Sequence, residues 1–274
     1  MPLRKAVYWS VFWILLSLLF NLAVYYTLGH QKALEFLTGY LIEKSLSVDN
    51  LFVFLIVFQM FGVELKDQRR VLNWGIIGVL ILRGILILLG SILVNRFEWI
   101  MYGFGILLVY AGYQVIFGQE REIHPEKNFA VKFFKKLFPV KDKIEGHHFF
   151  IKEGIHWVAT PLFICLIVIE TTDVIFAVDS IPAIFAITTD PFIVLTSNIM
   201  AVLGLRSLYF VLVDVHRSFA FVKYGVGVVL GFIGAKMLIA EFYHIDTLVS
   251  LIIVISILGI SVILSTFKKN NPSL

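Results

Sequence analysis

Acidic side chains recur within long apolar stretches of this chain of 274 residues. Glu43 and Asp49 lie six residues apart in one stretch, and Asp173 and Asp179 lie six apart in another. A charged group inside a membrane is costly, so such residues are paired, hydrated, protonated or bound to a metal ion. Carboxylate, amide and hydroxyl oxygens are ligands for hard divalent cations. The candidate metal ligands are therefore Glu43, Asp49, Asn50, Glu170, Asp173, Asp179 and Ser180.

Two arginines, Arg83 and Arg206, lie in similar apolar stretches, and we assign them to charge balance. Each charge at the centre of a membrane span costs about 2.5–3.5 kcal/mol. Five acids outnumber two arginines, which leaves a formal charge of −3. A divalent cation removes two of these charges and a proton removes the third. In the alternative interpretation, the arginines neutralise two acids in a structural network and the other acids stay protonated.

The types of ligand narrow the choice of metal. Oxygen donors suit Mg²⁺, Ca²⁺ or Mn²⁺, and they do not separate manganese from calcium. No pair of cysteines or histidines lies among the candidate ligands, which disfavours copper and weakens the case for zinc. The single cysteine, Cys165, lies in an apolar run, so we expect a core thiol and no disulfide within the chain.

The spacing of the acids also constrains the helices that carry them. Positions six apart on an α-helix differ by about 120° around the axis and by about 9 Å along it. Glu43 and Asp49 cannot face one point from a straight helix, and neither can Asp173 and Asp179. We therefore predict that both helices are kinked or locally unwound. Pro182 supports a break in the second of them, because proline removes a backbone donor.

Composition identifies the surroundings of these residues as a membrane. The chain is 59% hydrophobic and 15% charged, with a mean hydropathy of +0.91, whereas a soluble domain is about half apolar and a quarter charged. The first apolar run is too long for a signal peptide and is read as a retained span. The predicted class is all-α, a polytopic membrane protein of about eight helices, with spans near 7–28, 35–60, 72–94, 98–117, 156–185, 191–213, 221–240 and 247–267.

The cationic residues fall on alternate connections between these spans. Loops 61–71, 118–155 and 214–220 and both termini carry most of them, whereas the other connections carry few. With eight spans, the cationic segments all lie on one side, so both termini are predicted to be cytoplasmic in the inner (plasma) membrane. The net charge of +4 is therefore explained by topology, and no nucleic-acid partner is expected.

The central loop contains a mixed aromatic and basic segment at residues 129–138. This segment is predicted to be a helix on the anionic cytoplasmic leaflet, with an ordinary solvated linker as the alternative. His147 and His148 follow in the same loop, where metal capture is the less favoured interpretation.

Two halves of the chain resemble each other. Glu43 and Asp49 correspond to Asp173 and Asp179, and Leu82-Arg83 corresponds to Leu205-Arg206, with paired glycines and tyrosines following in the same order. Each half holds three spans, and an odd number of spans inverts the second half relative to the first. Inverted repeats are an architecture of secondary transporters, with the site near the midplane. The predicted organisation is an N-terminal helix 1–34, a first repeat 35–117, a basic cytoplasmic loop 118–155, a second repeat 156–240 and a C-terminal helix and tail 241–274.

At these motifs the sequence resembles the TerC/Alx family of integral membrane proteins. The matching stretches are Phe36–Asn50, Asp173–Phe185, Thr188–Asn198 and Gly204–Arg206. The resemblance covers roughly residues 8–265, although many family members carry an additional span at the N-terminus. It implies manganese efflux, with links to tellurite resistance and alkaline pH. It also implies that Glu43, Asp49, Asp173 and Asp179 act on the ion path.

Residues and resemblance together predict a membrane transporter that exports divalent metal ions, with Mn²⁺ favoured, through a carboxylate site at the midplane in exchange for protons. A calcium/proton exchanger is the nearest alternative. A membrane-protein assembly factor without transport activity is an alternative from another class. No pairing of a nucleophile with a base is visible, so no enzyme activity and no resident cofactor are expected. The expected partners are the lipid bilayer and the transported ion, and the sequence leaves the oligomeric state open.

Overall fold

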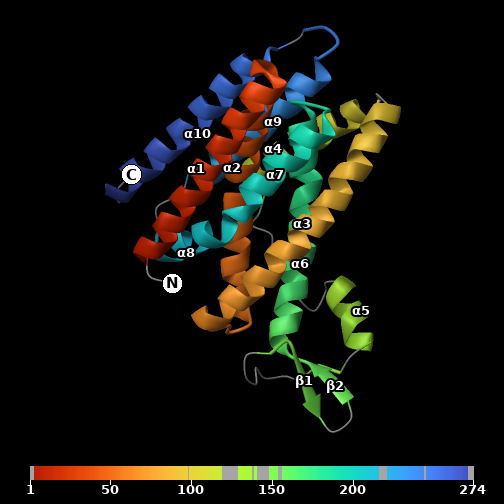
Figure 1. Ribbon diagram of the computed structural model, residues 1–274, viewed down its shortest axis with the longest axis vertical. Coiled ribbons are helices and arrows are strands. Elements are labelled where there is room, and N and C mark those ends of the chain that lie inside the picture. The colour runs from red at the N-terminus through yellow and green to blue at the C-terminus, as the bar shows by residue number, and fades with distance from the viewer. Residues whose placement is uncertain are drawn as a thin grey trace.

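A computed structural model describes residues 3–97, 99–118, 129–137, 139–140, 148–153, 156–215, 221–243 and 245–270. Within helices and strands, the side chains of 48, 49, 52, 137, 153, 156, 214, 215, 222 and 266–270 are outside this description. The elements in chain order are α1 (Leu3–Leu28), α2 (His30–Met60), α3 (Leu65–Arg96), α4 (Ile100–Phe117), α5 (Phe129–Leu137), β1 (Phe150–Glu153), β2 (His156–Ala159), α6 (Pro161–Phe185), α7 (Pro191–Leu203), α8 (Leu205–Val215), α9 (Val222–Leu238) and α10 (Thr247–Asn270) (Figure 1).

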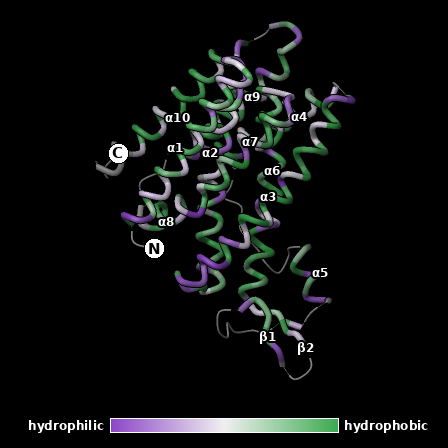
Figure 2. The backbone as a smooth tube through the Cα atoms, in the orientation of Figure 1, coloured by the Kyte–Doolittle hydropathy of each residue, from purple (hydrophilic) through white to green (hydrophobic). Residues whose placement is uncertain are grey.

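The long helices expose apolar side chains in a way that fits lipid. Leu19 is 62% exposed, Ile92 61% and Ile106 62%. Figure 2 shows hydrophobic residues along most of the length of the long helices. In the described part of the chain, six segments are long and apolar enough to cross a membrane: α1, α3, α4, α6, the α7–α8 segment Pro191–Val213 and Thr247–Ser265 in α10. The predicted class, an all-α polytopic membrane protein, is confirmed.

Two of the eight predicted spans, α2 and α9, fall outside that group of six. Helix α2 has 31 residues, but Glu43, Lys44 and Asp49 make its central part more polar. Helix α9 has 17 residues, slightly fewer than a typical span. The eight-span topology therefore stays a prediction.

The predicted span 156–185 begins later than its sequence indicated. Residues His156–Ala159 form β2, which pairs antiparallel with β1, and the helix begins at Pro161. Proline suits the first position of a helix, because its fixed φ is helical and the missing N–H would have no partner there. Trp157 therefore lies on the hairpin, at the end of the bundle that holds the basic loop.

Of the predicted kink or local unwinding in the second and fifth spans, the unwinding is wrong, and the kink stays a prediction. Helix α2 is continuous from His30 to Met60, and α6 is continuous from Pro161 to Phe185. Pro182 lies in the last turn of α6, where its missing N–H removes one helical hydrogen bond without interrupting the helix. No break is needed at the acids, because the side chains that meet come from different helices. The discontinuity falls instead between α7 and α8, at Gly204.

The helix contacts follow the pattern expected for two related halves. Helix α2 packs against α7, and α3 packs against α6; α2 also contacts α6, and α3 contacts α7. In the predicted repeat, α2 corresponds to α6, α3 to the α7–α8 segment and α4 to α9. Exchanging each helix with its counterpart turns the α2–α7 contact into the α3–α6 contact and leaves the other two contacts unchanged. The third helices, α4 and α9, form the most extensive pairing. A two-fold relation between the halves predicts these contacts, and the repeat itself stays a prediction.

Glycines permit the close contact between α4 and α9. A Cβ atom at Gly112 would lie 2.6 Å from the Gly227 carbonyl oxygen, and one at Gly234 would lie 2.7 Å from the Gly105 carbonyl oxygen. Gly105 corresponds to Gly227 and Gly112 to Gly234 in the repeat. The pairs Gly105–Gly234 and Gly112–Gly227 therefore exchange with each other, as in an isologous contact. Small residues at such positions let helix backbones approach closely.

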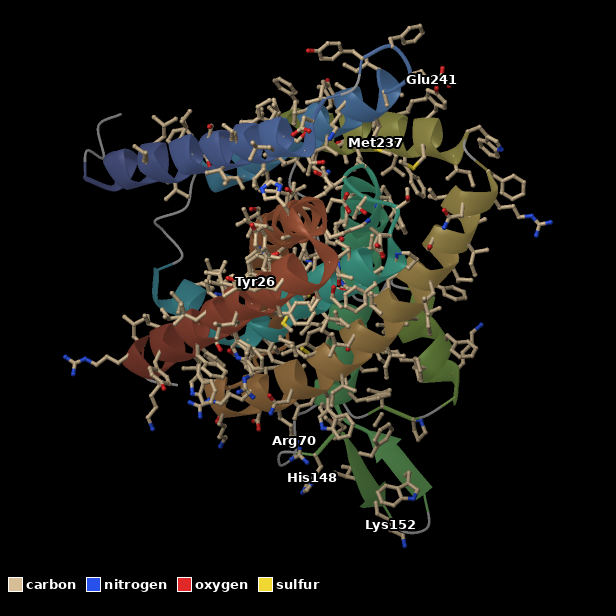
Figure 3. The ribbon with its side chains drawn as sticks, turned by 45° about the horizontal axis from the view of Figure 1, so that its top comes forward. Tyr26, Arg70, His148, Lys152, Met237 and Glu241 are labelled. Atoms are coloured by element: carbon tan, nitrogen blue, oxygen red, sulfur yellow. The ribbon has the colours of Figure 1, made fainter. Side chains whose placement is uncertain are left out.

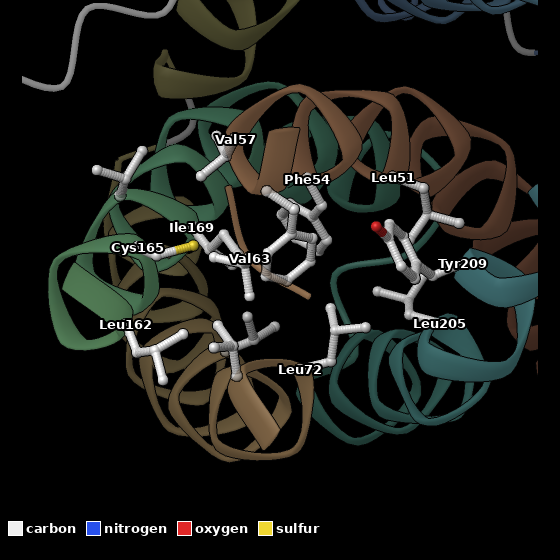
Figure 4. Close-up of a cluster of buried hydrophobic side chains, with 14 of the residues drawn as sticks. Leu51, Phe54, Val57, Val63, Leu72, Leu162, Cys165, Ile169, Leu205 and Tyr209 are labelled. Atoms are coloured by element: carbon white, nitrogen blue, oxygen red, sulfur yellow. The ribbon is translucent and has the colours of Figure 1, made fainter. Parts of the chain in front are cut away.

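A hydrophobic core fills the bundle between α2, α3, α6 and α8. Phe54, Cys165 and Tyr209 belong to one buried cluster there (Figure 4). Cys165 is fully buried, so the predicted core thiol is confirmed. The Tyr209 hydroxyl donates to Gln68 Oε1 at 2.9 Å, which satisfies its polar end within this apolar region.

The connections separate into two ends of the molecule. Figure 1 shows the N-terminus, the α2–α3 turn, α5 and the β-hairpin in the lower half and the α9–α10 turn at the top. Among the described residues, the lower end carries these cations: Arg4, Lys5, Lys66, Arg69, Arg70, Lys132, Lys135, Lys136 and Lys152. The predicted helix 129–138 is present as α5. His148 is exposed, and the predicted neighbour His147 lies outside the described residues.

Candidate functional site

Arg83 of α3 is buried at the centre of the bundle, with 2% of its surface exposed. Its Nε donates to Asp173 Oδ2 at 2.8 Å, and its Nη2 donates to Asp173 Oδ1 at 2.9 Å. Its Nη1 donates to Glu43 Oε1. One guanidinium group therefore joins the corresponding acids of the two halves, and the contact with Asp173 is bidentate.

Two asparagines complete the hydrogen bonding of these carboxylates. Asn50 Nδ2 donates to Asp173 Oδ1 at 3.2 Å, and Asn198 Nδ2 donates to Glu43 Oε2 at 3.0 Å. The Ser47 hydroxyl donates to Glu43 Oε1 at 3.4 Å. We call this group the carboxylate cluster; its members, each at most 2% exposed, are Glu43, Ser47, Asn50, Arg83, Asp173 and Asn198.

Local helix geometry explains how α2 and α7 reach the cluster. Glu43, Ser47 and Asn50 follow the i, i+4, i+7 spacing that places side chains on one helix face. Helix α7 approaches this face closely at Gly39, where a Cβ atom would lie 3.0 Å from Ser197 Oγ. The close approach brings Asn198 within hydrogen-bonding distance of Glu43.

Both asparagines keep a buried oxygen without a hydrogen-bond partner. The unpartnered atoms are Asn50 Oδ1 and Asn198 Oδ1. An ionised carboxylate only accepts hydrogen bonds, so each amide must direct its NH₂ group to the neighbouring acid. Rotating either amide by 180° would place two acceptors together. The two carbonyl oxygens are therefore held as free acceptors, which in native proteins bind water or a cation.

Further oxygens lie along one face of α6. Glu170, Asp173, Ala177 and Ser180 follow helical spacing over about 15 Å of rise. Glu170 Oε2 and Ser180 Oγ are buried and have no hydrogen-bond partner. Gly78 of α3 makes room for Glu170, because a Cβ atom there would lie within 2.6 Å of both carboxylate oxygens. The cluster is thus one part of a longer row of oxygen atoms.

The charge of the cluster is unbalanced. Glu43 and Asp173 carry two negative charges and Arg83 one positive charge, which leaves a formal charge of −1. Among the residues that the structure describes, no three His, Cys, Asp or Glu side chains lie close enough together to hold a metal ion. In this conformation the guanidinium group of Arg83 occupies the position between the two acids.

The structure gathers some of the predicted site residues and separates others. Glu43, Asn50, Asp173 and Arg83 meet in the cluster, and Glu170 and Ser180 lie on the same face of α6 as Asp173. Asp179 is half-buried on α6 and makes a contact of its own. The side chain of Asp49 lies outside the described residues.

The structure places Arg206 away from Glu43 and Asp173, and its role in charge balance stays a prediction. Arg206 Nη1 donates instead to Asn73 Oδ1, near the start of α3. Asn73 precedes Arg83 by ten residues, or about 15 Å along that helix. The physical reason is the break at Gly204, which starts a new helix, α8, immediately before Arg206. The corresponding part of α3 is unbroken.

The structure places two residues beside the acids that are not among the predicted site residues. Asn198 donates a hydrogen bond directly to Glu43. Lys44 was not singled out, although it lies within a predicted span. Its Nζ donates to the Ala201 carbonyl at 3.1 Å, at the C-terminal end of α7, where a cation is favourable. A Cβ atom at Gly204 would lie 2.6 Å from that Nζ, so glycine leaves room for the lysine.

A second ion pair lies at the end of the molecule opposite the hairpin. Lys32 Nζ contacts Glu35 Oε2 and Asp190 Oδ2, each at 3.0 Å. Asp190 also caps α7 by accepting from the Phe192 amide. Partial burial by itself raises the pKa of Asp190, but the hydrogen bonds and charge of Lys32 and the bonds from backbone amides outweigh it. The pKa of Asp190 is therefore lower than its ordinary value.

Comparisons with known proteins identify the family. The model of the integral membrane protein TerC family matches residues 28–273. A protein of Salmonella typhi, described as a candidate membrane-bound redox modulator and called Alx, is 47% identical over 278 residues, covering 98% of this chain and 86% of its own length. The Alx protein of Escherichia coli (strain K12) is 47% identical, covering 97% and 86%. An uncharacterized membrane protein of Myxococcus xanthus is 42% identical, covering 98% and 84%.

No solved structure is significantly similar to the chain, so the family assignment depends on sequence. The matched region contains every member of the carboxylate cluster. The family resemblance of the motifs around Glu43 and Asp173 is thereby confirmed. The chain belongs to the TerC family of integral membrane proteins.

Proposed function

We propose that the chain is a transporter that exports a divalent metal ion, manganese, through the carboxylate cluster. The observation that carries this proposal is the pair of buried, unpartnered amide oxygens of Asn50 and Asn198 beside two carboxylates. A closed structural network would satisfy its buried acceptors, because each unsatisfied one is costly. Two carbonyl oxygens and two carboxylates are the donor set that a hard cation prefers.

In this proposal the conformation with Arg83 between Glu43 and Asp173 is the ion-free state. The guanidinium group limits repulsion between the acids and holds them in place. An arriving cation competes with it for the carboxylate oxygens, while the Asn50 and Asn198 oxygens become additional ligands. Arg83 would then keep its positive charge but lose its contact with at least one acid. Exchange for protons fits the excess of buried acids, because an acid that has lost both cation and arginine favours its protonated form.

The direction of transport and the identity of the metal depend on separate arguments. The cationic end of the molecule would face the cytoplasm under the positive-inside rule, and we propose the inner membrane as the location. Oxygen ligands support manganese and calcium equally, and the choice of manganese comes from the family resemblance. The ion is the cargo, and we propose neither a resident cofactor nor an enzyme activity.

The description of the Alx relatives as redox modulators does not lead us to propose thiol chemistry. The chain has one cysteine, and Cys165 is fully buried in an apolar cluster. An exchange between two thiols within one chain is therefore excluded. An assembly role without transport stays the alternative function, and the same experiment tests it.

The test is uptake by proteoliposomes of Mn²⁺, Ca²⁺, Zn²⁺ and Mg²⁺, with and without a pH gradient. Wild-type protein should take up Mn²⁺, and Glu43→Gln and Asp173→Asn should each reduce the rate by at least roughly ten-fold. Asp67→Asn is a matched control, because Asp67 is a buried acid of α3 outside the cluster. Inactivity of the wild type towards all four ions would reject transport. Uptake of Ca²⁺ in preference to Mn²⁺ would reassign the cargo.

A further inference from the structure

Helix α5 is fixed to the bundle by one of its faces. Val131 is 1% exposed, and the Phe134 ring packs edge-on against Phe163 of α6 with 5.5 Å between ring centroids. Phe163 also contacts Phe150 of the β-hairpin, at 4.4 Å between centroids. One aromatic side chain in the first turn of α6 thus anchors both α5 and the hairpin.

The opposite face of α5 combines apolar and cationic side chains. Phe129, Lys132, Phe133 and Lys136 follow the i, i+3, i+4, i+7 spacing of one helix face. Phe129 is 82% exposed and Phe133 is 51% exposed, and Lys132, Lys135 and Lys136 are exposed beside them. The sequence 129–137 contains no acidic residue. We call this surface the Phe–Lys face.

The position of this face relative to the bundle identifies what surrounds it. Figures 1 and 3 show α5 beside the first part of α6, at the end of the molecule that holds the hairpin. The first turns of α3 at this end carry Lys66, Arg69 and Arg70. An exposed phenylalanine is unfavourable in water and a lysine is unfavourable among acyl chains, but both are accommodated in the zone of lipid headgroups.

We propose that the Phe–Lys face binds the headgroups of acidic phospholipids in the membrane that the chain spans. Three lysines without a neighbouring acid on α5 complement negatively charged phosphate groups, and the two phenylalanines complement the adjoining acyl region. Each cation close to an anionic surface contributes roughly a five-fold preference over a neutral surface. This binding is independent of the transported ion, so the failure of either proposal leaves the other intact.

The experiment uses the full chain with a polarity-sensitive fluorophore at Phe129→Cys. Cys165 is fully buried, so the introduced thiol is the accessible one. The protein is placed in nanodiscs of phosphatidylcholine, alone or with phosphatidylglycerol. We expect phosphatidylglycerol to shift the emission towards that of an apolar environment and to increase quenching by lipids that carry a nitroxide near the headgroup. The variant K132Q/K135Q/K136Q should lose at least roughly five-fold of this lipid preference, and the matching triple arginine variant should retain it.

Two controls keep the result interpretable. A fluorophore at Phe242→Cys, which is 87% exposed in the α9–α10 turn, should not respond to the α5 lysine changes. Added salt should weaken the phosphatidylglycerol effect in the protein with native lysines, which tests the charge contribution without altering α5. Equal quenching at position 129 in both lipids, or a probe that stays in water in both, would overturn the proposal.

Discussion

Arg83 and Asp173 form a bidentate ion pair in the interior, with donor–acceptor distances of 2.8 and 2.9 Å, and this pair connects α3 to α6. The two helices run parallel, because Gly75 faces Ile169 near their starts and Gly90 faces Phe185 near their ends. Because one buried ion pair connects these parallel helices, the charge balance of the cluster depends on the single side chain of Arg83.

Replacing Arg83 with Gln should therefore destabilise the protein strongly. The change leaves Glu43 and Asp173 buried together without their cation, and removal of one partner from a buried pair costs about 3–5 kcal/mol. Arg83→Lys should recover only part of this loss, because an ammonium group cannot make the bidentate contact. The measurement is thermal unfolding in detergent. Arg206→Gln is the matched control and should cost about 1 kcal/mol or less, since Arg206 donates to the neutral side chain of Asn73. Equal losses for the two variants would contradict the central role of Arg83.

Replacing Asn198 with Leu tests the unpartnered oxygens. The variant removes both the hydrogen bond to Glu43 and the free carbonyl oxygen, so the Mn²⁺ concentration for half-maximal uptake should rise by roughly ten-fold. The matched control is Asn21→Leu, because Asn21 Oδ1 is also buried and unpartnered but belongs to α1, outside the cluster. Unchanged uptake by the Asn198 variant would show that its oxygen is not an ion ligand.

An added methyl group should separate α4 from α9. Gly112→Ala should lower the free energy of unfolding by about 1–3 kcal/mol, because its Cβ atom would lie 2.6 Å from the Gly227 carbonyl oxygen. Gly103→Ala, in the same helix, has no atom within 4 Å of its added Cβ and should be neutral or stabilising. The measurement is thermal unfolding of the two variants. A smaller loss of stability for Gly112→Ala than for Gly103→Ala would contradict the glycine contact.

The Lys32–Asp190 ion pair should give a pH-dependent contribution to stability. The lowered pKa of Asp190 means that its contribution is complete above its ordinary value of 3.8 and is lost as pH falls through the lower pKa of the folded state. Burial by itself lowers the pKa of Lys32, but the hydrogen bonds and charges of Glu35 and Asp190 outweigh it and raise the pKa above 10.5. The Lys32 contribution is thus complete below 10.5 and is lost as pH rises through the higher pKa of the folded state.

Asp190→Asn keeps a side chain that can cap α7 but removes the ion pair, so it should cost about 1 kcal/mol or less near neutral pH. Asp190→Ala also removes the cap and should cost about 0.5–2 kcal/mol more. Unfolding measured as a function of pH should show the Asn variant converging on wild type in strong acid. A difference that grows as pH falls would reverse the assigned sign.

Sequence alone indicated the helices and several site residues because lipid imposes a simple rule on both. An apolar stretch long enough to cross the membrane forms a helix, and a charged residue inside it is costly unless it is paired, hydrated or bound to an ion. Glu43, Asp173 and Arg83 were identified by that rule, and they meet. The eight-span topology and the inverted repeat required counting α2 and α9, whose polarity and length place them at the margin of the rule.

The structure differs from the prediction where similar local sequences make different contacts in three dimensions. Arg83 and Arg206 each follow a leucine in an apolar stretch. Helix α7 ends at Gly204, however, so Arg206 lies on a separate helix, α8. The predicted unwinding assumed that both acids of one helix contact the same site. In the structure, Arg83 binds one acid from each of two helices, Glu43 of α2 and Asp173 of α6. Lys44 could not be predicted as a site residue, because its hydrogen bond is to the Ala201 carbonyl near the end of α7, a contact that the sequence around Lys44 does not indicate.

The backbone contact between Gly105 and Gly234, repeated between Gly112 and Gly227, limits how the molecule can move. The main chains of α4 and α9 are in direct contact at these two points, which leaves little room for the helices to slide, so we expect this contact to act as a pivot for the two halves. Relative rotation about it would open and close the contacts of α2 with α7 and of α3 with α6. Under the proposed function, an ion bound by the carboxylate cluster would lie between these helices, where a small rotation gives a large displacement.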